Sequence, residues 1–534
     1  MSGGKSILKN AFTVGALTAL SRVLGLVREM LQATVVGAGV AQSAFALAFA
    51  LPNMARKLFG EGALTAAFVP VFKGVAENES LERAARLARS VMTMVVLMLS
   101  ACVLLSFGAL DLGVRFKDAF GLEDSERLRL TVRLVKTLLP YMVFICGAAF
   151  GMGVLNSLGR FTASSFMPCL LNVCCIATLG CLAFCPGLSP GECAQRVAVA
   201  ILVAGALQMA FLFWRMAKAG VAPRLTFSGW GDEKVRLVWR NLGVAAMGAG
   251  AVQVNYMLDQ VLAQLAAPWA AGVISYSERL MDLPLGVVGV AFGTVLLPTF
   301  AGLFAKGDVE GAKSALSSSL RSLMFVMLPS AAGLFVLAPE MTRAIYEGGA
   351  FDAAATVRVS RAVAVYALGL GFFSFQKTLV PWFQAQSDMK TPLRVSVVAV
   401  CLNAALNILA VATLPEEWRH VGLAASTVVC AGFSCAFLYV LARRRNGSLG
   451  LASCVGPVAR MAAASVSMAI VVWFLKPFAE SLAAPLSPRA ASVAALSVLV
   501  AAGVAAYGAL ALVLMPDAAR GLIRRFRAPR RASR

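Results

Sequence analysis

Apolar runs of about 20 to 30 residues recur along the whole chain and are separated by short polar segments. Each run is long enough to cross a hydrocarbon layer of about 30 Å as a helix. The runs are continuous and rich in Ala, Leu, Val and Gly, whereas the strands of a membrane barrel alternate apolar and polar residues. The pattern therefore predicts an all-α polytopic membrane protein with about 14 transmembrane helices, centred near residues 22, 57, 97, 142, 174, 206, 251, 287, 325, 369, 402, 431, 464 and 503.

Basic residues in the connecting segments predict the orientation. If the N-terminus is cytoplasmic, the even-numbered connections are cytoplasmic too, and these include 215–240 with six basic residues and 443–445 with three. The odd-numbered connections 37–42 and 267–272 have none, although 111–129 mixes acids and bases. Because cytoplasmic loops carry an excess of Lys and Arg, we expect a multi-pass protein of the cytoplasmic (inner) membrane with both termini inside. We interpret the first apolar run as a retained helix, not a signal peptide.

Short segments repeat at a spacing of about 230 residues. Six predicted spans separate the copies, so the repeat is parallel and predicts two six-helix lobes facing a central cavity, with two helices added at the C-terminal end. The predicted parts are an N-terminal lobe at 1–220, a second lobe at 221–445, two further helices at 446–516 and a basic tail at 517–534. The matched segments are 51–52 with 283–284, 68–72 with 296–300, 156–160 with 386–390, and Asn172 with Asn403.

Composition narrows the class of function. The chain is 59% hydrophobic and only 14% charged, with a mean hydropathy of +0.80, which excludes an ordinary soluble domain. Its net charge of +22 could indicate nucleic-acid binding in a soluble protein, but in a membrane protein it is typical of positive-inside anchoring. The glycine-rich stretches lack a Walker-type Gly-Lys-Ser/Thr, and we see no metal-binding or nucleophile pattern. We expect neither an enzyme nor a nucleic-acid partner.

Four arginines lie well inside the apolar segments: Arg22, Arg28, Arg56 and Arg279. Each costs roughly 2.5 to 3.5 kcal/mol at the centre of a spanning helix by insertion scales. They could extend to the membrane interface or pair with nearby carboxylates. The interpretation that we favour is a hydrated cavity that binds an anion, because guanidinium groups match phosphate oxygens in a bidentate way.

Neighbouring residues are auxiliary candidates. Glu29 is seven residues from Arg22 and shares its helical face, so it could moderate the basic charge. Proline bends a helix, so a helix break is predicted near Pro52 in the first half and near Pro284 in the second. Asn53 and Arg56 follow Pro52. Glu278 and Arg279 precede Pro284.

Two carboxylates are candidates for buried charge. Asp259 follows an asparagine at helical spacing, and Asp388 lies beside Lys390. Such groups could hold a hard cation such as Na⁺ or exchange a proton, and roles at a helix end or in an ion pair fit equally well. The single histidine, His420, is expected in an exposed loop.

The 12 cysteines fit no zinc spacing, and most are expected to be small buried hydrophobes. Cys185 and Cys193 flank a short loop that we place outside the cytoplasm, where a disulfide could form.

The residues resemble the MurJ (MviN) family of lipid II flippases, within the multidrug/oligosaccharidyl-lipid/polysaccharide exporter superfamily. The resemblance covers essentially all fourteen spans. It is carried by Ser21-Arg22-Val23-Leu24-Gly25 with Arg28-Glu29, Leu51-Pro52-Asn53 through Arg56, Glu61-Gly62-Ala63, Phe68-Val69-Pro70, Tyr276 to Pro284, and Gly289 to Pro298.

The resemblance implies transport of the undecaprenyl-diphosphate-linked peptidoglycan precursor, lipid II, from the inner to the outer leaflet. It implies that the four arginines are the cavity arginines of the family, and that Asp259 and Asp388 match a cation site in some members. Gln384 and Ala404 among the surrounding positions, and Ser43 where the family often has Asp, depart from the pattern. Coupling to Na⁺, to H⁺ or to the membrane potential therefore stays open.

We expect alternating access, with the polyprenyl tail kept in lipid along a groove near the last two helices. We expect no cofactor, and a monomer that contacts membrane lipids, with association with the cell-wall synthesis machinery left open. An exporter of another lipid-linked oligosaccharide or of drugs is the nearest alternative. A membrane enzyme acting on polyprenyl phosphates should show clustered Asp or a catalytic His, and a purely structural scaffold should tolerate loss of the arginines.

Overall fold

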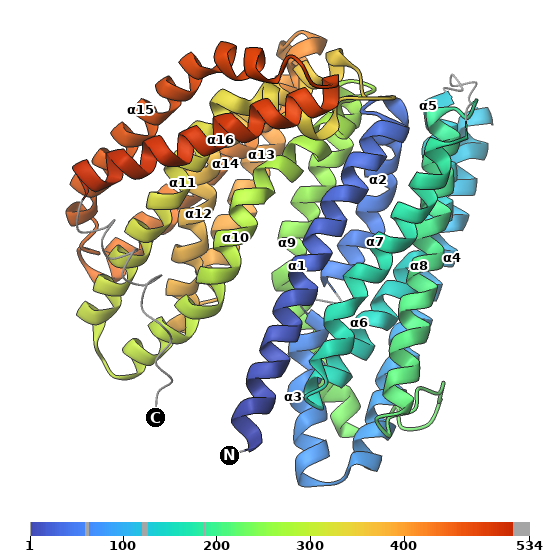
Figure 1. Cartoon of the computed structure of the whole chain (residues 1–534). Helices are drawn as coiled ribbons and strands as arrows, with labels where there is room; N and C mark the ends of the chain where they lie inside the picture. The colour runs from blue at the N-terminus through green and yellow to red at the C-terminus, as the bar shows by residue number, and fades with distance from the viewer. Residues whose placement is uncertain (1, 59–62, 120–125, 186, 516–534) are drawn as a thin grey trace. The chain divides into compact units, whose positions relative to one another are not determined.

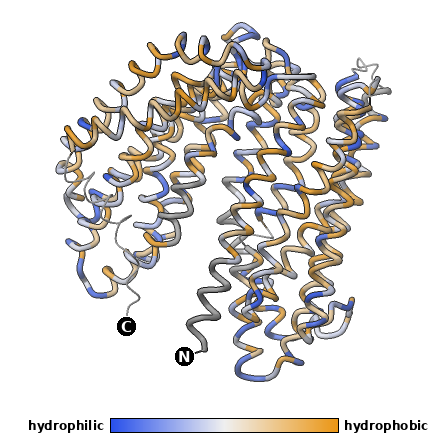
Figure 2. Tube along the Cα trace, in the orientation of Figure 1, coloured by the Kyte–Doolittle hydropathy of each residue, from blue (hydrophilic) through white to orange (hydrophobic). Residues whose placement is uncertain are grey.

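The structure is a computed structural model and describes residues 2–58, 63–119, 126–185 and 187–515. Glu61 and Gly62 of the family motif and the basic tail 517–534 lie outside the described residues, as do the side chains of 287–294. The described chain is helical almost throughout and divides into two compact units, Met1–Gly272 with Gly349–Phe351, and Val273–Gly348 with Asp352–Arg534 (Figure 1). Orange apolar residues predominate along the helices in both units (Figure 2).

The first unit contains nine helices among its described residues. The long helix α1 packs along α7, and α6 packs against α8 (Figure 1). The helices are α1 (Ser2–Val36), α2 (Val40–Ala55), α3 (Ala63–Asn78), α4 (Leu81–Ala119), α5 (Glu126–Leu138), α6 (Tyr141–Ser157), α7 (Phe161–Ala183), α8 (Pro190–Ala217) and α9 (Glu233–Ala266).

The second unit is built on a layer of long helices covered by the last two. Helices α11 and α12 pack together, and α15 and α16 lie side by side against α11 (Figure 1). The helix α10 (Ala270–Ala305) begins at the end of the first unit and continues into the second. The remaining helices are α11 (Val309–Tyr346), α12 (Ala353–Ala385), α13 (Lys390–Thr413), α14 (Glu416–Asn446), α15 (Ala452–Ala483) and α16 (Pro488–Leu514).

Two predicted spans are interrupted helices. The span centred near residue 57 is α2 followed by a π-turn at 56–58 and then α3. The span centred near residue 142 is α5 and α6, which meet at Pro140. Proline lacks the N–H that a helix interior requires, and this accounts for the break before α6. Every other predicted centre lies inside a single helix.

The structure confirms an all-α membrane protein. Within the described residues, ten helices are long and apolar enough to cross a membrane, so the count of fourteen crossings stays a prediction. The lobe boundary at residue 220 also stays a prediction. The compact units of the structure divide at Gly272, and α9 packs on α2 and α3 of the first unit.

The two matched helix ends of the repeat share one backbone geometry. After α6, Gly159 has φ +74°, and the N–H of Arg160 bonds the carbonyl of Leu155 at 2.9 Å. After α12, Ser387 has φ +59°, and the N–H of Asp388 bonds the carbonyl of Phe383 at 3.0 Å. This left-handed cap favours glycine. The geometry aligns Gly159 with Ser387, two residues away from the match made on sequence.

The structure differs from the sequence-based predictions at His420 and at the cysteine pair Cys185 and Cys193. His420 is fully buried in α14, where its Nε2 lies 3.1 Å from the carbonyl oxygen of Arg358. The position expected in an exposed loop is instead near the start of α14, which packs on α12. Cys185 and Cys193 are both free, the first exposed and the second buried in α8, so the disulfide that the sequence allowed is not formed.

Candidate functional site

Arg22 lies on α1 shortly after two residues whose carbonyls are bonded by side chains of α7. The side-chain amide of Asn172 donates to the carbonyl of Ser21 at 3.0 Å, and the thiol of Cys169 donates to the carbonyl of Leu17 at 3.6 Å. Asn172 and Cys169 are buried, whereas Arg22 is exposed on the unit. These contacts fix the rotation of α1 and leave Arg22 on an exposed face of the helix.

Arg28 lies two turns further along α1 and is largely buried. Its Nη2 is 2.6 Å from Oε1 of Glu29, and the two side chains are 17% and 14% exposed. The Nε of Arg28 is buried without a hydrogen-bond partner among the described residues. Glu29 therefore forms an ion pair with Arg28, and its moderating effect on Arg22 stays a prediction. Arg28 retains hydrogen-bonding capacity for an anion.

Arg56 lies in the π-turn that ends α2. Its Nη2 and Nε donate to Oδ1 of Asn53 at 3.1 and 3.3 Å. The neighbouring Lys57 lies over the ring of Tyr256, 5.1 Å from its centroid. Insertions of a π-turn into helices are frequent at functional sites.

Arg279 is positioned by the buried face of α10. Tyr276 and Ser277 are fully buried, and the hydroxyl of Ser277 bonds the carbonyl of Val359 on α12 at 3.2 Å. The ring of Tyr276 packs on Tyr346, with 4.8 Å between centroids. Arg279 and Asp282, three residues apart on the helix, are both exposed. Glu278 is half-buried between the two faces.

The predicted cation-site residues are distributed over both units. In the first unit, Asp259 accepts a hydrogen bond at 3.1 Å from the amide of Asn255. In the second, Gln384 is half-buried near the end of α12. No group of three His, Cys, Asp or Glu side chains suited to a metal ion occurs within the part of the chain that the structure describes.

Asp388 has several donors of its own. It accepts hydrogen bonds from the backbone N–H groups of Lys390 and Thr391 at 3.1 and 2.9 Å, and it pairs with Arg445. Burial raises the pKa of the Asp388 carboxyl. The hydrogen bonds from Thr391 and Arg445 lower it by more, so its pKa is about 2. Asp388 therefore caps the start of a helix and forms an ion pair, which is one of the two kinds of role that the sequence left open.

Ser43 carries a contact that the sequence did not indicate. It is fully buried in α2, and its Oγ accepts the N–H of Gly272, in the first turn of α10, at 2.9 Å. Its carbonyl accepts a hydrogen bond from the side chain of Gln264. The first N–H groups of a helix have no partner within that helix. Ser43 therefore satisfies one of them from a different helix, and a carboxylate could do the same.

Replacing Ser43 by alanine is expected to destabilise the protein by about 1–3 kcal/mol, because the buried N–H of Gly272 would lose its acceptor. Asp at this position should keep most of the stability, since a carboxylate is favoured at a helix N-terminus. Thermal unfolding of the two variants in detergent gives the comparison, with Ser497→Ala, on the exposed face of α16, as a control. Equal stability of Ser43→Ala and the unchanged protein would contradict this role.

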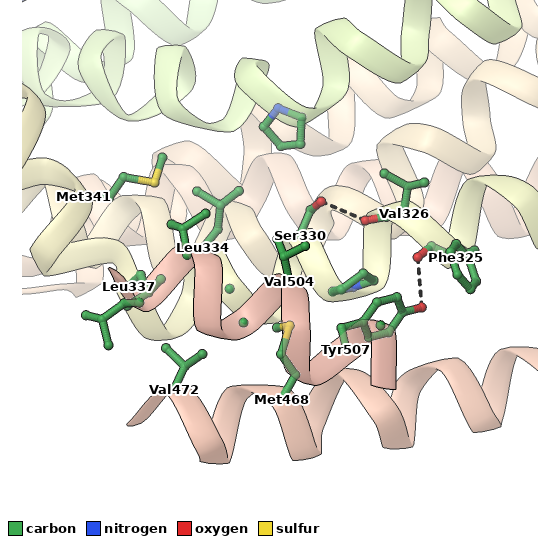
Figure 3. A pocket seen from close by; sticks show the side chains of 17 residues that line it. Phe325, Val326, Ser330, Leu334, Leu337, Met341, Met468, Val472, Val504 and Tyr507 are labelled. Carbon is green, nitrogen blue, oxygen red and sulfur yellow. Dashed lines mark hydrogen bonds between the residues drawn. The ribbon is translucent and has the colours of Figure 1, made fainter. Parts of the chain in front are cut away.

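An apolar cavity lies in the second unit, between α11, α15 and α16 beside Pro284 of α10 (Figure 3). Its volume is about 520 Å³. The hydroxyls of Ser330 and Tyr507 at its wall are already bonded to the carbonyls of Val326 and Phe325, at 2.7 and 2.9 Å (Figure 3). The remaining lining is apolar and includes Leu334, Leu337, Met341, Met468, Val472 and Val504 (Figure 3). The cavity suits a hydrocarbon chain and not a charged headgroup.

Sequence reasoning missed the anchoring role of Asn172 and the contacts of Ser43 and Gln264. Asn172 was visible only as a match between the two halves of the chain. A buried amide in an apolar helix requires a partner, and that requirement was the available signal. The identity of the partner depends on how α1 and α7 pack.

Comparisons with known proteins identify the family. Residues 32–487 match the family described as "Lipid II flippase MurJ". A protein of Rhizobium tropici named "Probable lipid II flippase MurJ" is 33% identical over 510 residues, which cover 95% of this chain and 94% of that one.

Two solved structures share the fold. "Lipid II flippase MurJ, inward closed conformation" matches with a TM-score of 0.75 at 21% identity, covering 96% of this chain and 99% of that one. An inward-facing multidrug resistance MATE family transporter of the MOP superfamily matches with a TM-score of 0.66 at 15% identity, covering 82% and 98%. With most of its length matched by the family and a relative above 30% identity over nearly the whole chain, this protein belongs to the MurJ family of lipid II flippases.

Proposed function

We propose that this protein moves lipid II from the cytoplasmic to the periplasmic leaflet of the inner membrane by alternating access, as a step in peptidoglycan and cell-wall synthesis. Family membership supports the substrate. The observation that carries the proposal is the set of arginines held at defined positions inside apolar helices.

In this proposal, Arg22, Arg28, Arg56 and Arg279 bind the diphosphate. Guanidinium groups form short, charge-assisted pairs with phosphate oxygens, often two at a time. The ion pair with Glu29 and the hydrogen bond from Arg56 to Asn53 orient two of them. Removing a diphosphate from water requires several such donors.

The polyprenyl tail would remain in an apolar environment throughout. The cavity between α11, α15 and α16 offers such a surface in the second unit. Transport then requires only the polar headgroup and diphosphate to pass through a hydrated path, while the tail stays with lipid. We expect the protein to act as a monomer, with both termini cytoplasmic, and its association with the synthesis machinery stays a prediction.

The membrane potential is the driving force that we favour. With the inside negative, it favours outward movement of the diphosphate and the return of an empty, cationic cavity. Coupling to Na⁺ or H⁺ through Asp259, Gln384 and Asp388 is the alternative. The donors already on Asp388 argue against it at that residue.

The nearest rival is a related exporter of drugs or of another lipid-linked oligosaccharide. An exporter of cationic drugs would be expected to present acidic cavity residues, which the arginines oppose. Arginines do not distinguish one lipid diphosphate from another, so the substrate has to be tested directly.

The test is the accessibility of labelled lipid II to a probe outside the cytoplasmic membrane. Depleting the protein is expected to remove accessible lipid II while the total is maintained, and re-expression should restore it. Accessible lipid II that persists after complete depletion, with no other flippase present, would contradict the function. A parallel measurement on another undecaprenyl-diphosphate saccharide separates the two exporter classes.

A further inference from the structure

The segment 221–232 joins α8 to α9 without helical structure, yet α4 holds it closely. We call this segment the strap. Side chains of α4 bond its backbone at three points. The contacts are Arg89 Nε to the carbonyl of Ala222 at 3.0 Å, Ser90 Oγ to the carbonyl of Ser228 at 3.0 Å, and the N–H of Thr226 to Thr93 Oγ1 at 2.9 Å.

Two further features fix the end of the strap. Gly229 has φ +85°, and a Cβ there would lie 2.9 Å from Ser90 Oγ, so this close approach to α4 requires glycine. Asp232 accepts a hydrogen bond at 2.7 Å from Arg83 and begins α9 by accepting the N–H of Lys234. The strap is thus a defined surface and not a loose connection.

This anchoring turns large apolar side chains outward. Leu225, Phe227 and Trp230 are 64%, 69% and 42% exposed, and the rings of Phe227 and Trp230 lie 5.9 Å apart. An ordered cluster of exposed apolar groups is costly in water and marks a site of interaction.

The level of the strap along α4 indicates what it meets. Its three bonds come from residues 89–93, where α4 changes from basic to apolar. Arg83, Arg86 and Arg89 lie before this point, and the next charged residue is Asp111. The strap therefore lies where α4 would pass from headgroups into hydrocarbon. Tryptophan and other aromatic residues are enriched at that depth.

Basic side chains lie in the strap and at the end of α8. Arg224 is exposed next to Leu225. At the end of α8, Lys218 Nζ lies over the ring of Trp214, 4.0 Å from its centroid, and Trp214 is 49% exposed. In the predicted orientation this connection is cytoplasmic, where the leaflet surface carries anionic lipids.

We propose that the strap is a binding site for anionic phospholipid headgroups, with Leu225, Phe227 and Trp230 inserted at the interface and Arg224 contacting the phosphate. It would hold the first unit at a fixed depth in the membrane. This role is separate from lipid II transport, because none of these residues belongs to the proposed diphosphate site.

Quenching of tryptophan fluorescence by brominated lipids tests this proposal on the full chain. The wild type and Trp230→Phe are reconstituted in phosphatidylcholine vesicles that contain brominated phosphatidylglycerol or brominated phosphatidylcholine at equal fractions. The difference between the two proteins isolates Trp230. We expect this component to be quenched more strongly by the anionic lipid.

Arg224→Gln should lower the preference for phosphatidylglycerol about fivefold, the effect of one basic residue at an anionic surface. Lys306→Gln, an exposed lysine outside the strap, should leave the preference unchanged. Equal quenching by both lipids would overturn the proposal. So would a Trp230 component quenched only by aqueous iodide, which would indicate a surface facing water or a protein partner.

Discussion

Replacing Arg22 or Arg279 by alanine is expected to reduce lipid II transport about ten- to a hundredfold. Hydrogen bonds to charged groups contribute about 1.5–3 kcal/mol each, and the lost donors would be aimed at a diphosphate that has left water. Lysine at either position should give an intermediate loss, because it keeps the charge but not the bidentate fork. The measurement is the rate of appearance of labelled lipid II in the outer leaflet of proteoliposomes.

The control for this series is Arg394→Ala, at an exposed arginine near the start of α13. Membrane insertion and thermal stability of each variant separate lost binding from lost folding. Full transport by well-folded Arg22→Ala and Arg279→Ala proteins would refute the proposed site. It would leave the transport function itself in place, because that rests on lipid II accessibility after depletion.

An inside-negative potential of 100 mV is expected to speed outward transport by up to about fiftyfold for each unneutralised charge that crosses the full field. The reason is that one charge gains about 2.3 kcal/mol over 100 mV. A potassium diffusion potential set with valinomycin, at equal pH and equal Na⁺ on both sides, provides the driving force in proteoliposomes. Reversing its sign should slow outward transport.

The ion-coupled alternative has a distinct outcome. Transport that ignores the potential but follows a Na⁺ or pH gradient would refute voltage coupling and would favour the carboxylates. Asp259→Asn should then lose gradient dependence. Under voltage coupling, the same variant should keep its response to the potential.

The chemistry of the proposed site was visible in the sequence because it conflicts with the surroundings. Arginine inside an apolar segment is costly wherever the helix lies, so Arg22 and Arg56 stand out without a structure. Their partners did not stand out. Sequence spacing indicated only that Glu29 shares a helix face with Arg22, whereas the structure shows that Glu29 forms an ion pair with Arg28.

The surroundings of two buried polar residues, His420 and Ser43, also could not be predicted from the sequence. His420 follows a short acidic, polar segment and was expected to be exposed, but the packing of α14 on α12 encloses it. Ser43 was noted only as a departure from a family pattern. Its contact with Gly272 spans more than two hundred residues and could be found only once α2 met the start of α10.

The sequence by itself determined the membrane class, the positions of the helices, the arginines inside them and the family. These follow from local composition and from the cost of charge in hydrocarbon, which need no knowledge of neighbours. Only the tertiary structure decided which face of each helix is buried, which partner each polar group finds, and that the strap presents its aromatic residues outward. Helices that are apolar on every side carry little periodic signal, so their rotation is set by packing between segments far apart in the chain.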